Sequence, residues 1–158
     1  MSSRSILIAL VLASSPLVAH AGHYRLPVDN LVTVDESNAL SKAGIRTTLG
    51  LLDHVAPLDK RRALAAKSGL TFVRLSTLAT QIDLLRVEGV GPSMVRLLQA
   101  AGIRHTRDLG AADAAGLREK MRVANGVHQI SSVLPQEDVV RSWIESARGL
   151  PQILEGVQ

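Results

Sequence analysis

The stretch Leu84-Leu85-Arg86-Val87-Glu88-Gly89-Val90-Gly91-Pro92-Ser93-Met94-Val95-Arg96-Leu97-Leu98 decides the fold that we expect for this chain. Two glycines, one residue apart, join two segments in which apolar residues recur at helical spacing. Pro92 follows the second glycine and suits the first turn of a helix, where a backbone N–H has no helical acceptor in any case. The pattern is typical of a helix-hairpin-helix turn, with one helix ending before Gly89 and the next beginning after Gly91.

The turn also has the chemistry of an anion site. Glycine permits unusual backbone dihedrals and the close approach of a bulky ligand, and the following helix directs its positive dipole end at the loop. We therefore expect this turn to contact the backbone phosphate of a nucleic acid, with Arg104 and Arg107 as further cations. The predicted phosphate-binding residues are Gly89, Val90, Gly91, Ser93, Arg86 and Arg96.

Two features limit what this site can recognise. Glu88 lies inside the loop and would repel a phosphate, and no aromatic residues are interleaved with the cations for stacking on single-stranded bases. Only sequence-nonspecific contact with a duplex backbone fits this composition. One alternative is a purely structural turn that lets two helices cross closely, and another is a monovalent cation held by the loop carbonyls. Arginines gathered on one face would favour DNA, whereas dispersed arginines would favour a scaffold.

Glycine, proline and capping residues divide the rest of the chain into helices. Residues 22–30 are expected to be extended, because Pro27 restricts Leu26 before it. Asp35 is the predicted N-cap of the first helix, and Gly44 its stop. The predicted helices cover 35–43, a short segment capped by Thr47 or Thr48, about 57–67, 71–85, 93–101, 106–109, 113 to about 123, and 135–149.

The chain also repeats itself. Ala43-Gly44-Ile45-Arg46 reappears 58 positions later as Ala101-Gly102-Ile103-Arg104. This predicts two related helix-hairpin-helix units, about 26–83 and 84–149, packed about a pseudo-two-fold axis. Under the same offset Gly89 and Gly91 fall on Leu31 and Thr33, so we expect the first unit to be structural and only the second to bind a ligand.

Residues 1–21 are predicted to be a secretory signal peptide. Arg4 precedes an apolar run from Ile6 to Ala13, and Val18-Ala19-His20-Ala21 supplies the small residues that a signal peptidase reads. Pro16 and two serines interrupt the apolar run before the ~20 residues that a bilayer requires. We expect cleavage after Ala21, no membrane span in the mature chain, and a periplasmic or secreted domain over residues 22–158.

Composition narrows both the fold and the function. The chain has no cysteine and one residue each of Trp, Tyr and Phe, so the core must be built from aliphatic residues, which favours packed helices. Its net charge is +4, of which Arg4 supplies one, so the mature chain is mildly basic. Trp143 is the expected core anchor and Lys60-Arg61-Arg62 a solvated helix face.

Neither a metal site nor a catalytic set is visible. His23, His54, His105 and His128 lack metal-ligand spacing and are predicted to be surface or capping residues. The carboxylates are scattered, and Ser, His and Asp form no familiar motif. We therefore predict no catalytic residue, no metal ligand and no cofactor, and a protein that is not an enzyme.

The chain resembles a bacterial family, the domain of unknown function numbered 4332, which is related to tandem helix-hairpin-helix proteins. The resemblance implies an all-α, tandem helix-hairpin-helix (SAM-like) bundle over nearly the whole mature chain, without enzymatic activity and with nucleic-acid binding as its expected property. The missing first glycine pair departs from the pattern and argues against a symmetric grip on a duplex. The segments that carry the resemblance are Ala43-Gly44-Ile45 with Thr48 and Leu51-Leu52, Asp83 to Val87 before Gly89-Val90-Gly91, Leu97-Leu98 before Ala101-Gly102-Ile103, Met121 to Asn125, and Leu134-Pro135 ahead of Trp143-Ile144.

Two functions remain as expectations. The first is an exported module that contacts DNA backbone phosphate through Gly89-Val90-Gly91. The second is a periplasmic protein-interaction or scaffold domain, with an unidentified protein partner, in which the hairpins are purely structural.

Overall fold

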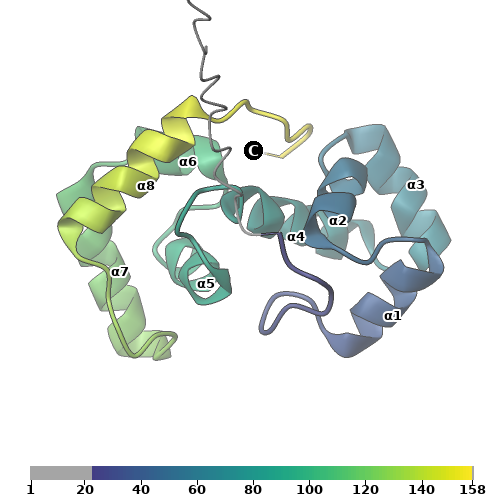
Figure 1. The fold of residues 1–158 in the computed structure, drawn as a ribbon, viewed down its shortest axis with the longest axis horizontal. Helices are drawn as coiled ribbons and strands as arrows, with labels where there is room; N and C mark the ends of the chain where they lie inside the picture. Colours follow the sequence, from purple (N-terminus) through teal and green to yellow (C-terminus); the bar gives the residue numbers. More distant parts are fainter. Residues whose placement is uncertain (1–22, 158) are drawn as a thin grey trace, which may run out of the picture.

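A computed structural model describes residues 23–157, which form eight α-helices (Figure 1). Two isolated β-bridges, Arg25–Thr47 and Val28–Val32, are the only extended pairings in these residues, so the predicted all-α class is confirmed. No helix between residues 23 and 157 is long and apolar enough to cross a membrane. The predicted signal peptide lies outside the described residues. The helices are α1 (Val34–Lys42), α2 (Thr48–Val55), α3 (Leu58–Ser68), α4 (Phe72–Leu84), α5 (Pro92–Ala100), α6 (Thr106–Ala111), α7 (Ala114–His128) and α8 (Glu137–Gly149).

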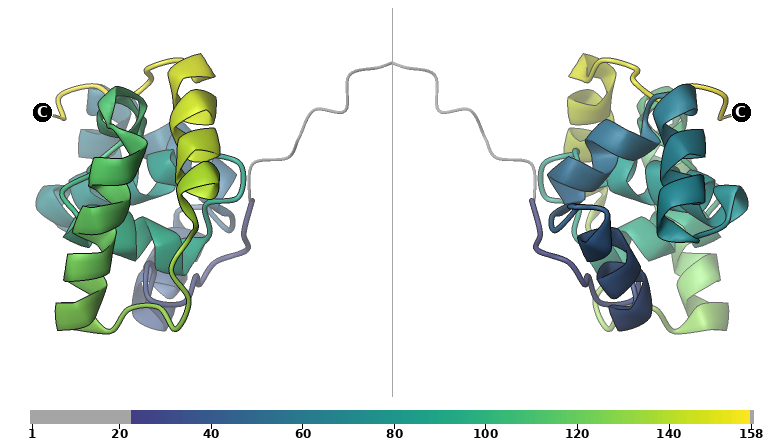
Figure 2. Two further views of the ribbon diagram at one scale, coloured as in Figure 1. Left: turned by 90° about the vertical axis from the view of Figure 1, so that its left-hand side faces the viewer. Right: turned by 90° about the vertical axis from the view of Figure 1, so that its right-hand side faces the viewer.

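The helices form two groups, with α4 and α5 in the middle of the molecule (Figure 1). On one side α2 packs on α3 and α4, and on the other α8 packs on α6 and α7 (Figures 1 and 2). One cluster of buried aliphatic side chains runs through both groups and includes Leu75 and Leu84 of α4 and Leu98 of α5. Trp143 is buried in this cluster, as predicted.

Most helix ends lie within two residues of their predicted positions, and two predictions need correction. Asp35 was wrong as the cap of α1, because Thr33 is the N-cap and Asp35 lies in the first turn. Thr33 and Glu36 bond reciprocally to each other's backbone N–H, which makes a capping box. The end of α7 lies five residues beyond the predicted Val123, because Ala124 continues the buried face of this helix.

The helix bounds follow the 58-residue offset. The bounds of α1 and α5 differ by 58 at both ends, and α2 and α6 begin at the equivalent Thr48 and Thr106. The N-caps of α2 and α6, Thr47 and His105, are equivalent too, and each accepts a hydrogen bond from the N3 backbone N–H. A glycine with positive φ follows both α1 and α5, at 89° and 92°.

After α8, residues 151–157 cross from the second helix group to the first, and we call them the C-terminal strap (Figure 1, yellow). Arg86 Nη2 donates to the Pro151 carbonyl at 3.0 Å, which fixes the start of the strap. At the other end, Glu155 N donates to the Ala56 carbonyl at 3.0 Å. Leu58 N donates to Glu155 Oε2 at 3.0 Å, so a strap carboxylate supplies the cap that Pro57 cannot give to α3.

Arg61 contradicts the prediction of a solvated Lys60-Arg61-Arg62 face. Its side chain is fully buried, while Lys60 and Arg62 are exposed. Its guanidinium donates to the carbonyls of Val55 at 2.5 Å, Ala56 at 3.1 Å and Glu155 at 2.9 Å. Burial lowers the pKa of Arg61, and the Glu155 carboxylate opposes that effect. Arg61 therefore ties α2, α3 and the strap together.

Candidate anion-binding site

The turn between α4 and α5 is held from inside by backbone hydrogen bonds and two buried valines. Arg86 N donates to the Asp83 carbonyl at 3.2 Å, and Val87 N to the Leu84 carbonyl at 3.1 Å. Val90 N donates to the Val87 carbonyl at 3.1 Å, so the amide of Val90, one of the predicted phosphate ligands, is occupied. With Val87 and Val90 buried, Glu88 and Gly89 form the exposed tip of the turn.

The two glycines of the turn have different structural demands. Gly89 has a φ of +81°, and a Cβ there would lie 3.1 Å from Nε1 of Trp143. Both the dihedral and the crowding require glycine at this position, as the alternative of closely packed helices expects. Gly91 has a φ of −92° and a ψ of 176°, which any residue adopts, and a Cβ there would only touch Tyr24 Oη at 3.8 Å. Packing therefore explains Gly89 but not Gly91.

Gly91 is the N-cap of α5, and it leaves the start of this helix open. No side chain within residues 23–157 caps α5. The backbone N–H groups of Gly91, Ser93 and Met94 donate to no acceptor among residues 23–157. Ser93 is exposed and Met94 half-buried. These amides lie at the positive end of the helix dipole, where an anion is stabilised.

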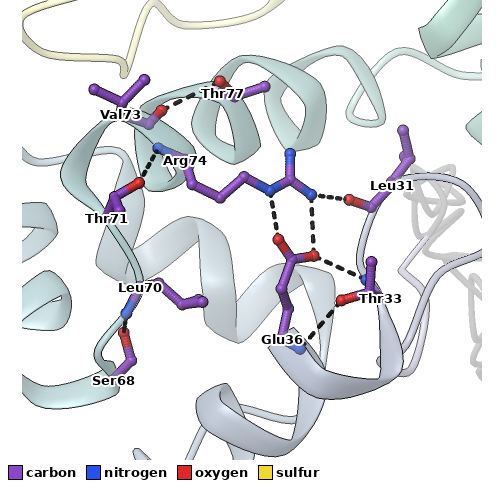
Figure 3. Close-up of polar contacts among 9 residues, drawn as sticks. All are labelled: Leu31, Thr33, Glu36, Ser68, Leu70, Thr71, Val73, Arg74 and Thr77. Atoms are coloured by element: carbon purple, nitrogen blue, oxygen red, sulfur yellow. Dashed lines mark hydrogen bonds and ion pairs between the residues drawn. The ribbon is translucent and has the colours of Figure 1, made fainter.

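The equivalent start of α1 is closed by its own side chains (Figure 3). Thr33 N donates to Glu36 Oε2 at 2.8 Å, and Glu36 N donates to Thr33 Oγ1 at 3.2 Å. Arg74 Nε lies 2.5 Å from Glu36 Oε1, and Arg74 Nη2 donates to the Leu31 carbonyl at 2.5 Å. The hydrogen bond from Arg74 holds the pKa of Glu36 below its ordinary value, although burial opposes this. The 58-residue offset places Gly91 and Met94 where α1 has Thr33 and Glu36, so the second copy lacks both capping side chains.

The structure does not gather the predicted arginines around the turn. Arg86 is half-buried: its Nη1 lies 2.5 Å from Oδ1 of the buried Asp83, and its Nη2 binds the strap. Arg104 pairs with Asp108 at 3.5 Å. Arg107 lines a different pocket, together with Asp83. Arg86 and Arg104 are thus paired with carboxylates, and Arg107 lies at another pocket and not at the turn.

Arg96 is the arginine that remains beside the start of α5. It lies three residues after Ser93, so the two share one face of the helix. It lines a shallow surface hollow with Gln99, His128 and Asn30. The site that the structure assembles consists of Gly91, Ser93, Met94 and Arg96, next to the exposed Glu88.

Metal-binding clusters are absent from residues 23–157, in which no three His, Asp or Glu side chains come together. Two of the histidines form backbone hydrogen bonds. His54 Nδ1 pairs with the Gly50 carbonyl at 2.8 Å, and His105 caps α6. His105 is a capping residue, one of the two predicted roles for the histidines, but it is buried.

Comparison with known proteins assigns the family. No curated protein and no solved structure gives a significant match to the chain. A family model described as "Domain of unknown function (DUF4332)" matches residues 31–150, which span α1 to α8 and include the turn between α4 and α5. The match covers well over half of the chain, and this protein belongs to the DUF4332 family.

Proposed function

We propose that this protein is a helix-hairpin-helix module that holds a phosphate of a DNA backbone at the start of α5 without reading the base sequence. One observation carries the proposal: the start of α5 is open, while the equivalent start of α1 is closed by Thr33 and Glu36. Packing of the two helices does not by itself require this difference. The module is non-enzymatic and needs no cofactor.

The two helix-hairpin-helix units of this proposal are residues 26–83 and 84–149. Their support is the equivalence of α1 with α5 and of the caps Thr47 and His105 under one offset. In the first unit the turn has lost both glycines and the helix start is sealed. The protein therefore has one phosphate contact per chain, and not the paired contacts of a symmetric grip.

The proposed phosphate contact is weak, and each donor adds a small amount to its affinity. The amides of Gly91, Ser93 and Met94 would donate to one phosphate, and the Ser93 hydroxyl and Arg96 lie on the same face of α5. Glu88, exposed at the tip of the turn, opposes the contact by like-charge repulsion. A helix N-terminus stabilises an exposed anion by about 0.3 to 1 kcal/mol, so binding depends strongly on low salt.

The place of action in this proposal is the periplasm or the medium. Its support is the sequence pattern of residues 1–21, a charged start, an apolar run and a small-residue cleavage site. The ligand would then be DNA outside the cytoplasm, such as DNA that is taken up or that forms an extracellular matrix. A modest net charge suits a weak contact with such a polymer.

The test is a substitution at Gly91, where the backbone conformation and the surroundings accommodate a side chain. Gly91→Asp places a carboxylate where Thr33 caps α1, which fills the open amides from inside and repels a phosphate. We expect duplex affinity to fall about two- to fivefold, because the contact with the helix N-terminus, about 0.3 to 1 kcal/mol, is lost. Folding should be unharmed or gain about 0.3 to 1 kcal/mol from the new cap.

Gly126→Asp is the matched control. It makes the same change in charge at an exposed position of α7 where a Cβ meets no other atom within 4 Å. Binding of a labelled duplex is measured from low to moderate salt, where log K should fall by about 0.9 per phosphate for each unit of log salt. Equal affinity of the two variants, or no binding by the parent protein at low salt, would remove the proposal.

A second candidate function, protein interaction in the periplasm, is favoured by one surface. Val123 and Val127 of α7 are 53% and 72% exposed, and they border a hollow of about 410 Å³ between α7 and the end of α5. The dispersal of the arginines points the same way. A partner captured from nuclease-treated periplasmic extract, and lost with Val127→Glu, would favour this function over DNA contact.

A further inference from the structure

His105 carries a buried donor that the fold does not use. The residue is 4% exposed, and its Nε2 atom is buried without a hydrogen-bond partner among residues 23–157. Its other ring nitrogen, Nδ1, accepts a hydrogen bond from Asp108 N at 3.3 Å as the cap of α6. Because Nδ1 accepts, the ring proton lies on Nε2, which is therefore a donor. Leaving such a donor unpaired in the interior costs about 1 to 3 kcal/mol.

Capping does not explain why this residue is a histidine. The equivalent cap of α2 is Thr47, whose Oγ1 accepts from Gly50 N at 3.1 Å. A threonine makes the same bond in the first helix group without burying an additional polar atom. The imidazole of His105 thus brings a second functional group to a position where a short hydroxyl side chain is sufficient.

His105 lines a small polar pocket of about 50 Å³. A site for one water requires about 10 to 15 Å³ by this measure, so the pocket has room for a group of several heavy atoms. Its walls are His105, Arg107 and Asp83 on one side, and Gln152, Leu154 and Val157 of the C-terminal strap on the other.

The polar groups of the pocket favour an anion. Both oxygens of Asp83 are already engaged: Oδ1 pairs with Arg86 at 2.5 Å, and Oδ2 accepts from Thr106 N and Oγ1, each at 2.8 Å. Its charge is thus compensated by Arg86. The Arg107 side chain is exposed and makes no hydrogen bond or ion pair within residues 23–157, so no carboxylate there neutralises its charge. The remaining groups are the donor of His105, the cation of Arg107 and the amide of Gln152.

The strap gives the pocket its roof. Pro151 is fixed by Arg86, and Glu155 is fixed at the junction of α2 and α3, so Gln152 and Leu154 are held over the pocket from both sides. Arg86 was predicted to contact the phosphate at the turn, but it compensates the charge of Asp83 and anchors the strap over the pocket.

We propose that the pocket beneath the C-terminal strap binds a small oxyanion through the Nε2–H of His105 and the guanidinium of Arg107. Inorganic phosphate, sulfate and short carboxylates share the required chemistry, a compact group of acceptor oxygens with negative charge. This site is separate from the open start of α5, so either proposal can fail without affecting the other.

The test is an NMR titration of the histidine ring nitrogens in the full mature protein at neutral pH. Sodium phosphate, sodium sulfate and sodium acetate are added in separate arms, with sodium chloride at equal ionic strength as the control. We expect a saturable shift of the His105 Nε2 resonance with at least one oxyanion and none with chloride. The arm with the tightest binding identifies the geometry of the anion.

Two variants remove one group each. His105→Asn keeps an N-cap acceptor for α6 but removes the ring donor, and Arg107→Gln removes the charge. Each should weaken oxyanion binding about tenfold, read from the anion-dependent rise in melting temperature, whereas Arg62→Gln on the exposed face of α3 should not. Arg107→Gln alone decides the question if His105→Asn does not fold.

Gly91→Asp distinguishes this site from the start of α5. Oxyanion binding that survives Gly91→Asp and is lost with Arg107→Gln supports the pocket. Absence of a saturable His105 shift, equal shifts with chloride, binding unchanged in both pocket variants, or binding lost with Gly91→Asp would overturn it.

Discussion

Replacing Arg61 with methionine is expected to destabilise the fold by about 3 kcal/mol. Methionine preserves the apolar stem but removes donors to the carbonyls of Val55, Ala56 and Glu155, all within 3.1 Å of the guanidinium. A hydrogen bond from a charged donor contributes about 1.5 to 3 kcal/mol, and the fully buried Arg61 makes three of them. The Ala56 carbonyl keeps the bond from Glu155 N, and Glu155 is exposed, so the net loss is smaller than the sum of the three bonds. Relief of the buried charge offsets only part of the loss.

Arg62→Met is the matched control, because Arg62 is the exposed neighbour on the same helix. Its change in unfolding free energy should stay within about 0.5 kcal/mol. Urea unfolding followed by circular dichroism gives both values, and a thermal scan should show Arg61→Met melting roughly 10 °C lower. If Arg61→Met and Arg62→Met unfold at the same urea concentration, the strap is not held through Arg61 and the reasoning is refuted.

Three further predictions follow from single contacts. Because Arg74 lowers the pKa of folded Glu36, the Arg74–Glu36 ion pair should stabilise the protein above the unfolded pKa of about 4.5 and lose that effect as the pH falls through the lower folded value. The difference in unfolding free energy between the parent and Glu36→Gln, measured by urea unfolding, should therefore shrink between pH 6 and pH 3. A difference that does not depend on pH would contradict this prediction. Glu88→Gln should raise duplex affinity about two- to fivefold at low salt by removing an exposed like charge, with no effect in high salt; a decrease in binding assays would place the phosphate elsewhere. Gly89→Ala should destabilise the fold by about 1 to 3 kcal/mol, because of its positive φ and the contact with Trp143, whereas Gly91→Ala should cost under about 1 kcal/mol; equal costs in thermal unfolding would show that the two glycines do not differ.

Local signals in the sequence were sufficient for the helices and for the turn. Gly44, Gly69 and Gly102 end α1, α3 and α5 or the turns after them, and Pro92 begins α5, as their backbone preferences require. The box at Thr33 and Glu36 also had a visible signal, Thr-x-x-Glu, which the choice of Asp35 overlooked. These features depend on neighbours within four residues.

Contacts across long sequence separations explain the features that were missed. Arg61 shares a helical face with Leu58 and Leu64, but its acceptor on Glu155 is 94 residues away and reaches it only through the strap. Arg86 was assigned to phosphate because it lies beside the turn, whereas its partners are Asp83 and the distant Pro151. The pocket at His105 likewise exists only when the strap covers it, so no local pattern predicts it.

The central claim is that the open amides at the start of α5 receive the phosphate, and backbone NMR during a titration with a short duplex at low salt tests it most directly. The amide resonances of Gly91, Ser93 and Met94 should shift progressively and saturate, while those of Thr33 and Glu36, already bonded within the capping box of α1, stay in place. Shifts confined to other surfaces, or equal shifts at the starts of α1 and α5, would contradict the account.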